Sequence, residues 1–471
     1  MLERIRPADR GDALTLLRWL AHSFRPMTLA ELQTTVIIRP ENDEVDFEDE
    51  GDFMDTMDIL AGLVVFSDDA DSTEKVDWTA ESFYADSSDD AEEVDYTKDD
   101  KAMTETRELT PATRIRLAHF SVKEYLESTR ISESSASAFR LEAGGCHRFL
   151  SQSCLTYLMS CSKSDGKTSP ELDFEKFHML EYAANQWYEH SRLQSGDDVS
   201  REVALLECEA ARLHWLRIAE LRRDELKLRD YGTLPSIYYA VTRCLPRVVE
   251  ELLEAGQDVN TVGPCDETLL VHATKAEDPD LEVVELLLAH GADVNAISRD
   301  HRGESALSYA AARGLPLTKL LVDSGADVNI VSGSGTALTA ACWKGDLSVA
   351  EFLLERGARV NTVDNSRQTA LATVSCEGHT KIVERLITKS AQVNRMKPAW
   401  INSSTTPLRA ATWFDHTDVV AMLIDAGADL NAEDGGALSD ALYFGHDVTD
   451  REAPASGLAV GRPKDAYSSL T

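Results

Sequence analysis

The sequence lacks the features of a membrane or secreted protein. No run of about 18 apolar residues is present to span a bilayer. The apolar stretch at 14–24 is interrupted by Arg18 and has no small-residue cleavage site, which argues against a signal peptide. The eight cysteines are scattered with no CxxC pair, a usage typical of reduced and mostly buried thiols. We therefore predict an intracellular protein, cytoplasmic or nuclear.

Positive charge is also scarce. The chain has 47 Lys and Arg against 82 Asp and Glu, which gives a formal net charge of −35 at pH 7. Residues 41–100 hold about 24 of the acids and two lysines, so roughly 22 of the 35 excess negative charges lie in about an eighth of the chain. Phosphate backbones and anionic lipids repel such a chain. We therefore expect neither nucleic acid nor a membrane as a partner.

The motifs of common enzymes are absent as well. There is no GxSxG nucleophile elbow and no HExxH zinc motif. His119 and Ser121 are neighbours without a third orienting group, so we expect a capping or packing role for them. The sequence GKT at 166–168 resembles the end of a phosphate-binding loop, but Cys161 stands where the first glycine of that loop belongs. We predict that the protein is not an enzyme and binds no cofactor or metal.

Six similar strings recur in the second half of the chain at spacings of 32 to 37 residues. They are GQDVN (256–260), GADVN (291–295), GADVN (325–329), GARVN (357–361), SAQVN (390–394) and GADLN (427–431). An apolar helical run precedes each string, and a helix rich in small residues lies about 21 residues upstream. One such unit cannot bury its apolar face alone, so the pattern predicts an α-solenoid of stacked helix pairs.

The small residues of these units have separate roles. A glycine after the outer helix can adopt left-handed backbone, which costs other residues about 1 kcal/mol or more. Ser390 replaces this glycine once, so we expect a weaker repeat there. Five alanines should let the inner helices approach closely: Ala240, Ala273, Ala310, Ala341 and Ala411.

These units resemble the ankyrin repeat, in which T-P-L-H-x-A-A-x-x-G-H is followed by an outer helix and G-A-D-V-N. TPLRAATWFDHTDVVAMLIDAGADLN at 406–431 matches best, and 336–361 and 369–394 follow it nearly residue for residue. The resemblance covers about 233–445 and gives six repeats and a degenerate seventh. We expect irregularity in the second repeat, which has about two extra residues, and in the third, which lacks one near Gly314.

The resemblance also implies a binding surface. In the ankyrin pattern, two variable residues after the alanines of each inner helix lie on the concave side, where protein partners usually dock. Tryptophan and arginine are the residues most enriched in binding hot spots. The predicted partner-binding residues are Arg313, Trp343, Lys344, Glu377, Trp413 and Phe414, with Trp400 in a nearby loop as a further candidate. The alternative is that the tryptophans only pack against a neighbouring repeat.

The N-terminal third has the elements of a winged helix at 12–130. We predict helices at 13–23 and 53–62, a helix that begins at a Thr28–Glu31 capping box, strands at 63–66 and 114–118, and a helix capped by Ser121 and Glu124. The segment at about 67–113 is acidic and poor in apolar residues, so we interpret it as a disordered insertion. A winged helix often binds DNA, but acidic residues on the helix at 53–62 oppose a phosphate backbone.

The region 138–230 shows helical periodicity throughout. Cys146, Cys154 and Cys161 should share a helical face, which favours packing over metal binding. The phrase LAHFSVKEYLES at 117–128, followed by CLTYLMS, LEYAANQWYEHSR and the repeats, resembles the part of fungal NACHT-ankyrin proteins of the STAND type downstream of their nucleotide-binding domain. The winged helix of those proteins is similar to that of GPI inositol-deacylase-like proteins. This resemblance implies a role in signalling or self/non-self recognition.

The predicted fold is mainly α: a winged helix and a helical segment are followed by an ankyrin-repeat solenoid and a disordered tail at 446–471. Two functions remain. The first is a non-catalytic intracellular scaffold that binds a protein partner, with the N-terminal part packed onto the first repeats as a cap. The second is the sensor part of a NACHT-type STAND NTPase, whose nucleotide-binding domain we do not expect in this chain. A Walker A loop encoded upstream in frame would favour the second.

Overall fold

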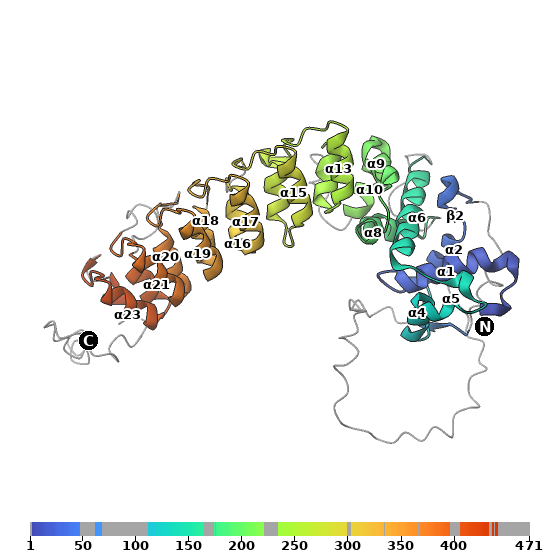
Figure 1. The fold of residues 1–471 in the computed structure, drawn as a ribbon, viewed down its shortest axis with the longest axis horizontal. Coiled ribbons are helices and arrows are strands. Elements are labelled where there is room, and N and C mark those ends of the chain that lie inside the picture. Colours follow the sequence, from blue (N-terminus) through green and yellow to red (C-terminus); the bar gives the residue numbers. More distant parts are fainter. Residues whose placement is uncertain are drawn as a thin grey trace, which may run out of the picture. The chain divides into compact units, whose positions relative to one another are not determined.

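The computed structural model describes residues 2–47, 62–67, 112–163, 174, 176–220, 234–298, 303–333, 335–364, 368–395, 406–432, 436–437 and 439–440. The chain divides into two compact units, Met1–Gln257 and Asp258–Thr471, and both are mainly helical (Figure 1). None of the helices within these ranges is long and apolar enough to cross a membrane. Nearly all of the predicted helix at 53–62, most of the predicted insertion and seventh repeat, and the tail at 446–471 lie outside the described residues.

The N-terminal part of the first unit combines short helices with a small sheet. Its elements are α1 (Arg10–His22), β1 (Met27–Thr28), α2 (Leu29–Thr35), β2 (Ile38–Arg39), β3 (Glu44–Val45), β4 (Val64–Ser67), β5 (Arg114–Leu117), α4 (Phe120–Glu127) and α5 (Thr129–Ser132). The two strands predicted at 63–66 and 114–118 are confirmed, and they pair antiparallel as β4 and β5. Strand β1 extends this sheet in the order β1-β5-β4, while β2 and β3 form a separate ribbon.

Two helix starts in this part test the predicted caps. The capping box of α2 is confirmed, because Thr28 Oγ1 accepts from the Glu31 amide at 3.2 Å and Glu31 Oε2 accepts from the Thr28 amide at 2.8 Å. The predicted cap of α4 was wrong. His119 is the N-cap, and its Nδ1 accepts a hydrogen bond from the Ser121 amide at 3.1 Å. The imidazole satisfies a free amide of the first turn, as expected of a capping group.

A bundle of longer helices completes the core of the first unit. It consists of α6 (Ala143–Lys163), α8 (Leu180–Leu193), α9 (Ser200–Glu207) and α10 (Glu209–Glu220). Its largest fully buried side chains include Trp187, Trp215 and Tyr157. The three cysteines predicted to pack along one helix face, Cys146, Cys154 and Cys161, are all buried on α6. In the ranges that the structure describes, no group of three or more His, Cys, Asp or Glu residues is arranged to hold a metal ion.

The first predicted repeat belongs to this unit and packs on the bundle. Its helices α12 (Ser236–Thr242) and α13 (Pro246–Glu254) both contact α9. The rings of Tyr239 and Trp215 meet edge to face at 6.2 Å, and the guanidinium of Arg243 lies over Trp215 at 5.5 Å and over Tyr188 at 4.5 Å. Because aromatic and cation–π contacts of this kind bury large surfaces, the bundle covers the N-terminal side of the repeat as a cap.

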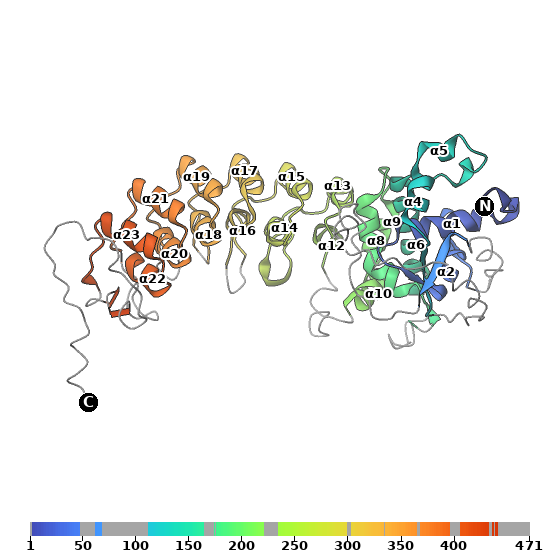
Figure 2. The same cartoon turned by 90° about the horizontal axis from the view of Figure 1, so that it is seen from below.

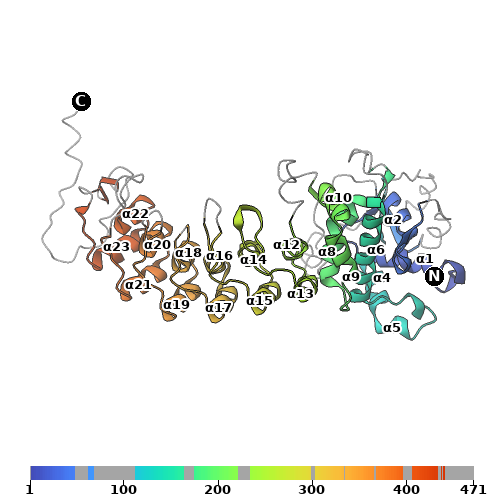
Figure 3. The same cartoon turned by 90° about the horizontal axis from the view of Figure 1, so that it is seen from above.

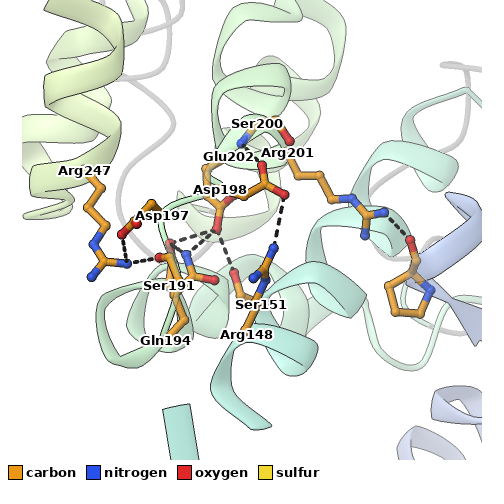
Figure 4. A network of polar contacts seen from close by, with 12 residues as sticks. Arg148, Ser151, Ser191, Gln194, Asp197, Asp198, Ser200, Arg201, Glu202 and Arg247 are labelled. Atoms are coloured by element: carbon orange, nitrogen blue, oxygen red, sulfur yellow. Dashed lines mark hydrogen bonds and ion pairs between the residues drawn. The ribbon is translucent and has the colours of Figure 1, made fainter. Parts of the chain in front are cut away.

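A polar network reinforces the bundle around the buried carboxylate of Glu202 (Figure 4). Its Oε1 accepts hydrogen bonds from Ser151 at 3.3 Å, Ser191 at 2.9 Å and Gln194 at 3.1 Å. These donors join α6, α8 and the loop before α9. Arg247 on α13 reaches the same loop, where it pairs with Asp197 at 3.5 Å. The network therefore connects three helices of the bundle with the outer helix of the first repeat.

In its described residues, the second unit contains five stacked helix pairs. They are α14 (Leu269–Lys275) with α15 (Leu281–Ala289), α16 (Ala306–Arg313) with α17 (Leu315–Asp323), α18 (Ala337–Lys344) with α19 (Leu347–Glu355), α20 (Ala370–Glu377) with α21 (Thr380–Thr388), and α22 (Pro407–Trp413) with α23 (Thr417–Asp425). Within α14 to α23, the inner helices form one row and the outer helices a second (Figures 2 and 3). The predicted alanines Ala310, Ala341 and Ala411 are fully buried between the inner helices. The helix, turn, helix unit is thus confirmed.

The recurring string has a structural role at each of its ends. Its glycines have positive φ, between 86° and 94° in the second unit, and Ser390 is held at φ 64° in the same position. Its asparagines link neighbouring repeats: Asn329, for example, accepts from the Arg359 amide at 2.8 Å and donates to the Gly357 carbonyl at 3.1 Å. The same acceptor contact, at 2.7 to 2.9 Å, is made by Asn260, Asn295, Asn361 and Asn394.

The irregular third repeat has a shortened turn. Only Gly314 separates α16 from α17, at φ 135°. In the next repeat, Gly345 and Asp346 lie between the two helices, and Asp346 caps the outer one by accepting from the Val349 amide at 3.1 Å. The predicted one-residue deletion near Gly314 is confirmed, and it removes this capping carboxylate.

Candidate protein-binding surface

The predicted site residues recur at one position of the repeat. In four consecutive inner helices the last turn ends with them: Arg313 on α16, Trp343 and Lys344 on α18, Glu377 on α20, and Trp413 with the following Phe414 on α22. We call this set the inner-helix row. Trp400, the further candidate, lies outside the described residues.

The aromatic members of the inner-helix row are exposed. Trp343 has 59% of its surface accessible, Trp413 48% and Phe414 56%. On the same helix as Trp343, Ala341 and Cys342 are completely buried. A tryptophan with more than half of its surface in water does not fill the space between repeats. Exposed aromatic rings at neighbouring sites are typical of surfaces that bind another protein.

A contact between repeats fixes the turn that carries Trp343 and Lys344. Gly345 ends α18 in the left-handed conformation at φ 80°, and its amide donates to the Ala341 carbonyl at 2.9 Å. The imidazole of His379, from the next repeat, lies against this glycine, so that a Cβ atom there would be 2.5 Å from the ring. Glycine is therefore required both for its backbone conformation and for this close approach.

A histidine of the following repeat fixes the turn after α20 in the same way, and this histidine also contacts Phe414. A Cβ atom on Gly378, at φ 77°, would lie 2.5 Å from Nδ1 of His416. His416 Nε2 donates to the Cys376 carbonyl at 2.8 Å, and its ring stacks on that of Phe414 with centroids 6.4 Å apart. One histidine thus connects the turn after α20 with an exposed aromatic of the row.

The charged members of the inner-helix row are all exposed, and one of them is hydrogen-bonded to the preceding repeat. Arg313 is exposed, and its Nη2 donates to the Lys275 carbonyl of the preceding repeat at 2.9 Å. Lys344 and Glu377 are also exposed. The row therefore presents two aromatic groups with charges of both signs between and beside them.

A second row of exposed apolar residues was not predicted from the sequence. Val262, Ile297 and Val331 have 48%, 41% and 42% of their surface accessible. Val262 and Ile297 form isolated antiparallel bridges to Thr268 and Ser305, just before the next inner helices. Each of the three lies two positions after the asparagine of the string. A β-branched residue at that fixed offset is the sequence signal that could have identified them.

Comparison with known proteins supports the repeat assignment. The family model for ankyrin repeats matches three overlapping stretches of this chain, residues 237–332, 280–364 and 338–434. These stretches include every helix pair described above from α12 to α23. The chain therefore contains ankyrin repeats, a class of module that generally mediates interactions between proteins.

Individual relatives align with only part of this chain. The chain is 31% identical over 204 residues to the ankyrin repeat and KH domain-containing protein CBG24701 of Caenorhabditis briggsae, which covers 42% of this chain and 7% of that protein. It is 42% identical over 104 residues to the B-cell lymphoma 3 protein homolog of Mus musculus, which covers 22% of each. The human ASB11 ankyrin repeat domain aligns with a TM-score of 0.38 and 23% identity, over 43% of this chain and 90% of that domain. The chain spans less than a quarter of these two curated relatives.

Proposed function

We propose that this protein is a non-catalytic scaffold that binds a protein partner through the inner-helix row of its ankyrin repeats. The observation that carries the proposal is the exposure of Trp343, Trp413 and Phe414 at equivalent ends of two inner helices. We further propose that the row lies on the concave face of the solenoid and that the binding serves signalling or self/non-self recognition inside the cell.

The aromatic rings supply most of the expected affinity. A tryptophan that becomes buried against a partner removes about 150–250 Å² from water, and such residues dominate measured binding energies. Replacement of Trp343 or Trp413 by alanine should each cost about 2 kcal/mol of binding free energy, or roughly 30-fold in Kd. Because Trp343 and Trp413 have 59% and 48% of their surface exposed in the free protein, each substitution should reduce folding stability by less than it reduces binding free energy.

The test is a quantitative pull-down from cell extract with wild type and the Trp343→Ala/Trp413→Ala double variant. Tyr125→Ala is a matched control, since Tyr125 is an aromatic residue on α4 with 41% of its surface exposed and lies outside the repeats. We expect the double variant to lose specific proteins that the control retains. Identical recovery from all three baits, or a thermal stability reduced in parallel with binding, would contradict the site assignment.

We also propose that residues 12–130 form a winged helix. The order α1, β1, α2, β4, β5 and the antiparallel sheet β1-β5-β4 support this proposal. Together with the LAHFSVKEYLES phrase, they favour the second candidate function, a sensor part of a NACHT-type STAND NTPase. An in-frame Walker A loop on the same transcript would support this role, and a stop codon directly upstream in its place would oppose it.

A further inference from the structure

A cavity of about 440 Å³ lies within the first unit, apart from the repeats. Its walls come from the end of α1 and the loop after it, from β5, from α4 and from α6. The lining includes Phe24, Arg116, Phe120, Lys123 and His147. A volume of this size is typical of sites for small molecules.

Among the residues that the structure describes, the charged groups on the cavity wall are all positive. Arg116, Lys123 and Arg25 line it, and no described carboxylate does. Arg25 is neutralised by Glu31, with its two nitrogens 2.8 Å and 2.5 Å from the carboxylate oxygens. Within the part of the chain that the structure describes, neither Arg116 nor Lys123 forms an ion pair. Two uncompensated cations at one cavity are unexpected in a chain with a formal net charge of −35.

A buried imidazole completes the polar wall. The side chain of His22 is 2% exposed and lines the cavity, and its Nε2 makes no hydrogen bond, although Glu127 Oε1 lies 3.5 Å away. His147 beside it is engaged on its other side, where its Nδ1 lies 2.8 Å from Nδ1 of His190. His22 lines the cavity, and an unsatisfied buried polar atom on such a residue is a position at which a ligand group or water can bind.

The electrostatics of this wall favour an anion. Burial, and then the nearby Lys123 ammonium, lower the pKa of His22 to about 3 and that of His147 to about 4. The imidazoles are therefore neutral at pH 7 and add no positive charge to that of the lysine. A negative group in the cavity would offset the charge of Lys123 and so remove one of the effects that disfavour protonation of the two histidines, while burial, the larger effect, stays.

We propose that this cavity binds a small organic anion, with its acidic group between Arg116 and Lys123 and its apolar part against Phe24 and Phe120. The two rings are 38% and 45% exposed, so they offer apolar surface at the cavity edge. Charge-assisted hydrogen bonds from a guanidinium and an ammonium suit either a carboxylate or a phosphate ester.

Titration calorimetry on the full chain tests this with three probes of one shape: 1-naphthoate, 1-naphthyl phosphate and neutral 1-naphthalenemethanol. We expect at least one anion to bind, and the alcohol to bind at least about tenfold more weakly. Lys123→Gln and Arg116→Gln should each weaken anion binding by about tenfold. Arg130→Gln, an exposed residue on α5 away from the cavity, is the matched control and should leave affinity unchanged. Arg116 is exposed on β5, so its variant remains informative if the lysine variant is poorly folded.

The pH dependence gives an independent readout. Bound anion should raise the pKa of His22 and His147, which are also faced by Lys123 and Glu127 from α4 and by His190 from α8. Binding then takes up protons, so 1-naphthoate should bind several-fold more tightly at about pH 5 than at about pH 8. Equal affinity for the alcohol, no binding of either anion, or Lys123→Gln and Arg116→Gln variants that bind like wild type would overturn the proposal.

Discussion

The glycine and histidine contact between repeats makes a quantitative prediction for Gly378→Ala. The reference is Gly357→Ala, because Gly357 has φ 91° and a Cβ atom there would meet nothing within 4 Å. The reference variant therefore loses only the left-handed backbone preference of glycine, about 1 kcal/mol. Gly378 has a similar φ of 77°, but its added Cβ would lie 2.5 Å from the imidazole of His416.

The steric part of the cost follows from that distance. Nonbonded heavy atoms pack at about 3.5 Å, so the ring would have to move by about 1 Å. Its hydrogen bond to the Cys376 carbonyl and its stacking on Phe414 oppose the movement. Overpacking of this kind costs about 1–3 kcal/mol, so Gly378→Ala should destabilise the repeats by about 2–4 kcal/mol in total. It should also weaken partner binding, because Phe414 belongs to the inner-helix row.

The free energy of unfolding of both variants is measured by urea denaturation, monitored by far-ultraviolet circular dichroism. Their midpoints can be compared directly if the dependence of this free energy on urea concentration is the same as in wild type. The double variant Gly378→Ala/His416→Ala removes the ring and should recover the steric part, which gives a coupling energy of about 1–3 kcal/mol. Equal destabilisation by Gly357→Ala and Gly378→Ala, together with no coupling to His416, would refute the reasoning.

Two further predictions concern other parts of the chain. Ser390→Gly should stabilise the repeats by up to about 1 kcal/mol in the same urea assay, because Ser390 occupies φ 64° where its equivalents are glycine; a lower midpoint would contradict this. The pKa of His22 in the folded state, about 3, lies below its unfolded value of 6.5, so the unfolded state binds more protons as pH falls from about 6.5 toward 3. His22→Gln should therefore lose less stability than wild type on acidification, with a difference of about 2 kcal/mol at about pH 5. Thermal melts of both proteins at several pH values measure this, and parallel pH profiles of Tm would exclude this role of His22.

The repeats were predictable because their physics is local and periodic. The sequence alone shows a glycine at a fixed position of each repeat, alanines in each inner helix and an apolar run in each outer helix. The helix pairs of the structure lie where these patterns predict them. Even the short turn at Gly314 could be located, since a missing residue breaks the period. The position of the inner-helix row followed from the same period, while its binding role stays a prediction.

Other features depend on residues that meet only in the folded chain. Strand β1 is two residues long, too short for any alternation to show. The capping or packing role expected for His119 was correct, but the cap of α4 was assigned to Ser121 with Glu124 because this pair matched a better-known pattern and histidine is an uncommon N-cap. The cavity joins the end of α1 to β5 and α6, segments separated by about a hundred residues in sequence. No motif or spacing connects them, so its cationic wall could not have been foreseen.

The repeat geometry separates stability from recognition. The buried alanines, the asparagine links and the glycines of the recurring string fix how each helix pair stacks on the next, whereas the side chains of the inner-helix row, in the last turn of each inner helix, are exposed. The residues of that turn can therefore change from Trp343 and Lys344 to Arg313 or Glu377 with little effect on folding. Because the stacking repeats, side chains at this position form a row whose chemistry varies from one repeat to the next. If the proposed function holds, a partner that contacts several repeats would bind a combination of side chains, and specificity would come from that combination.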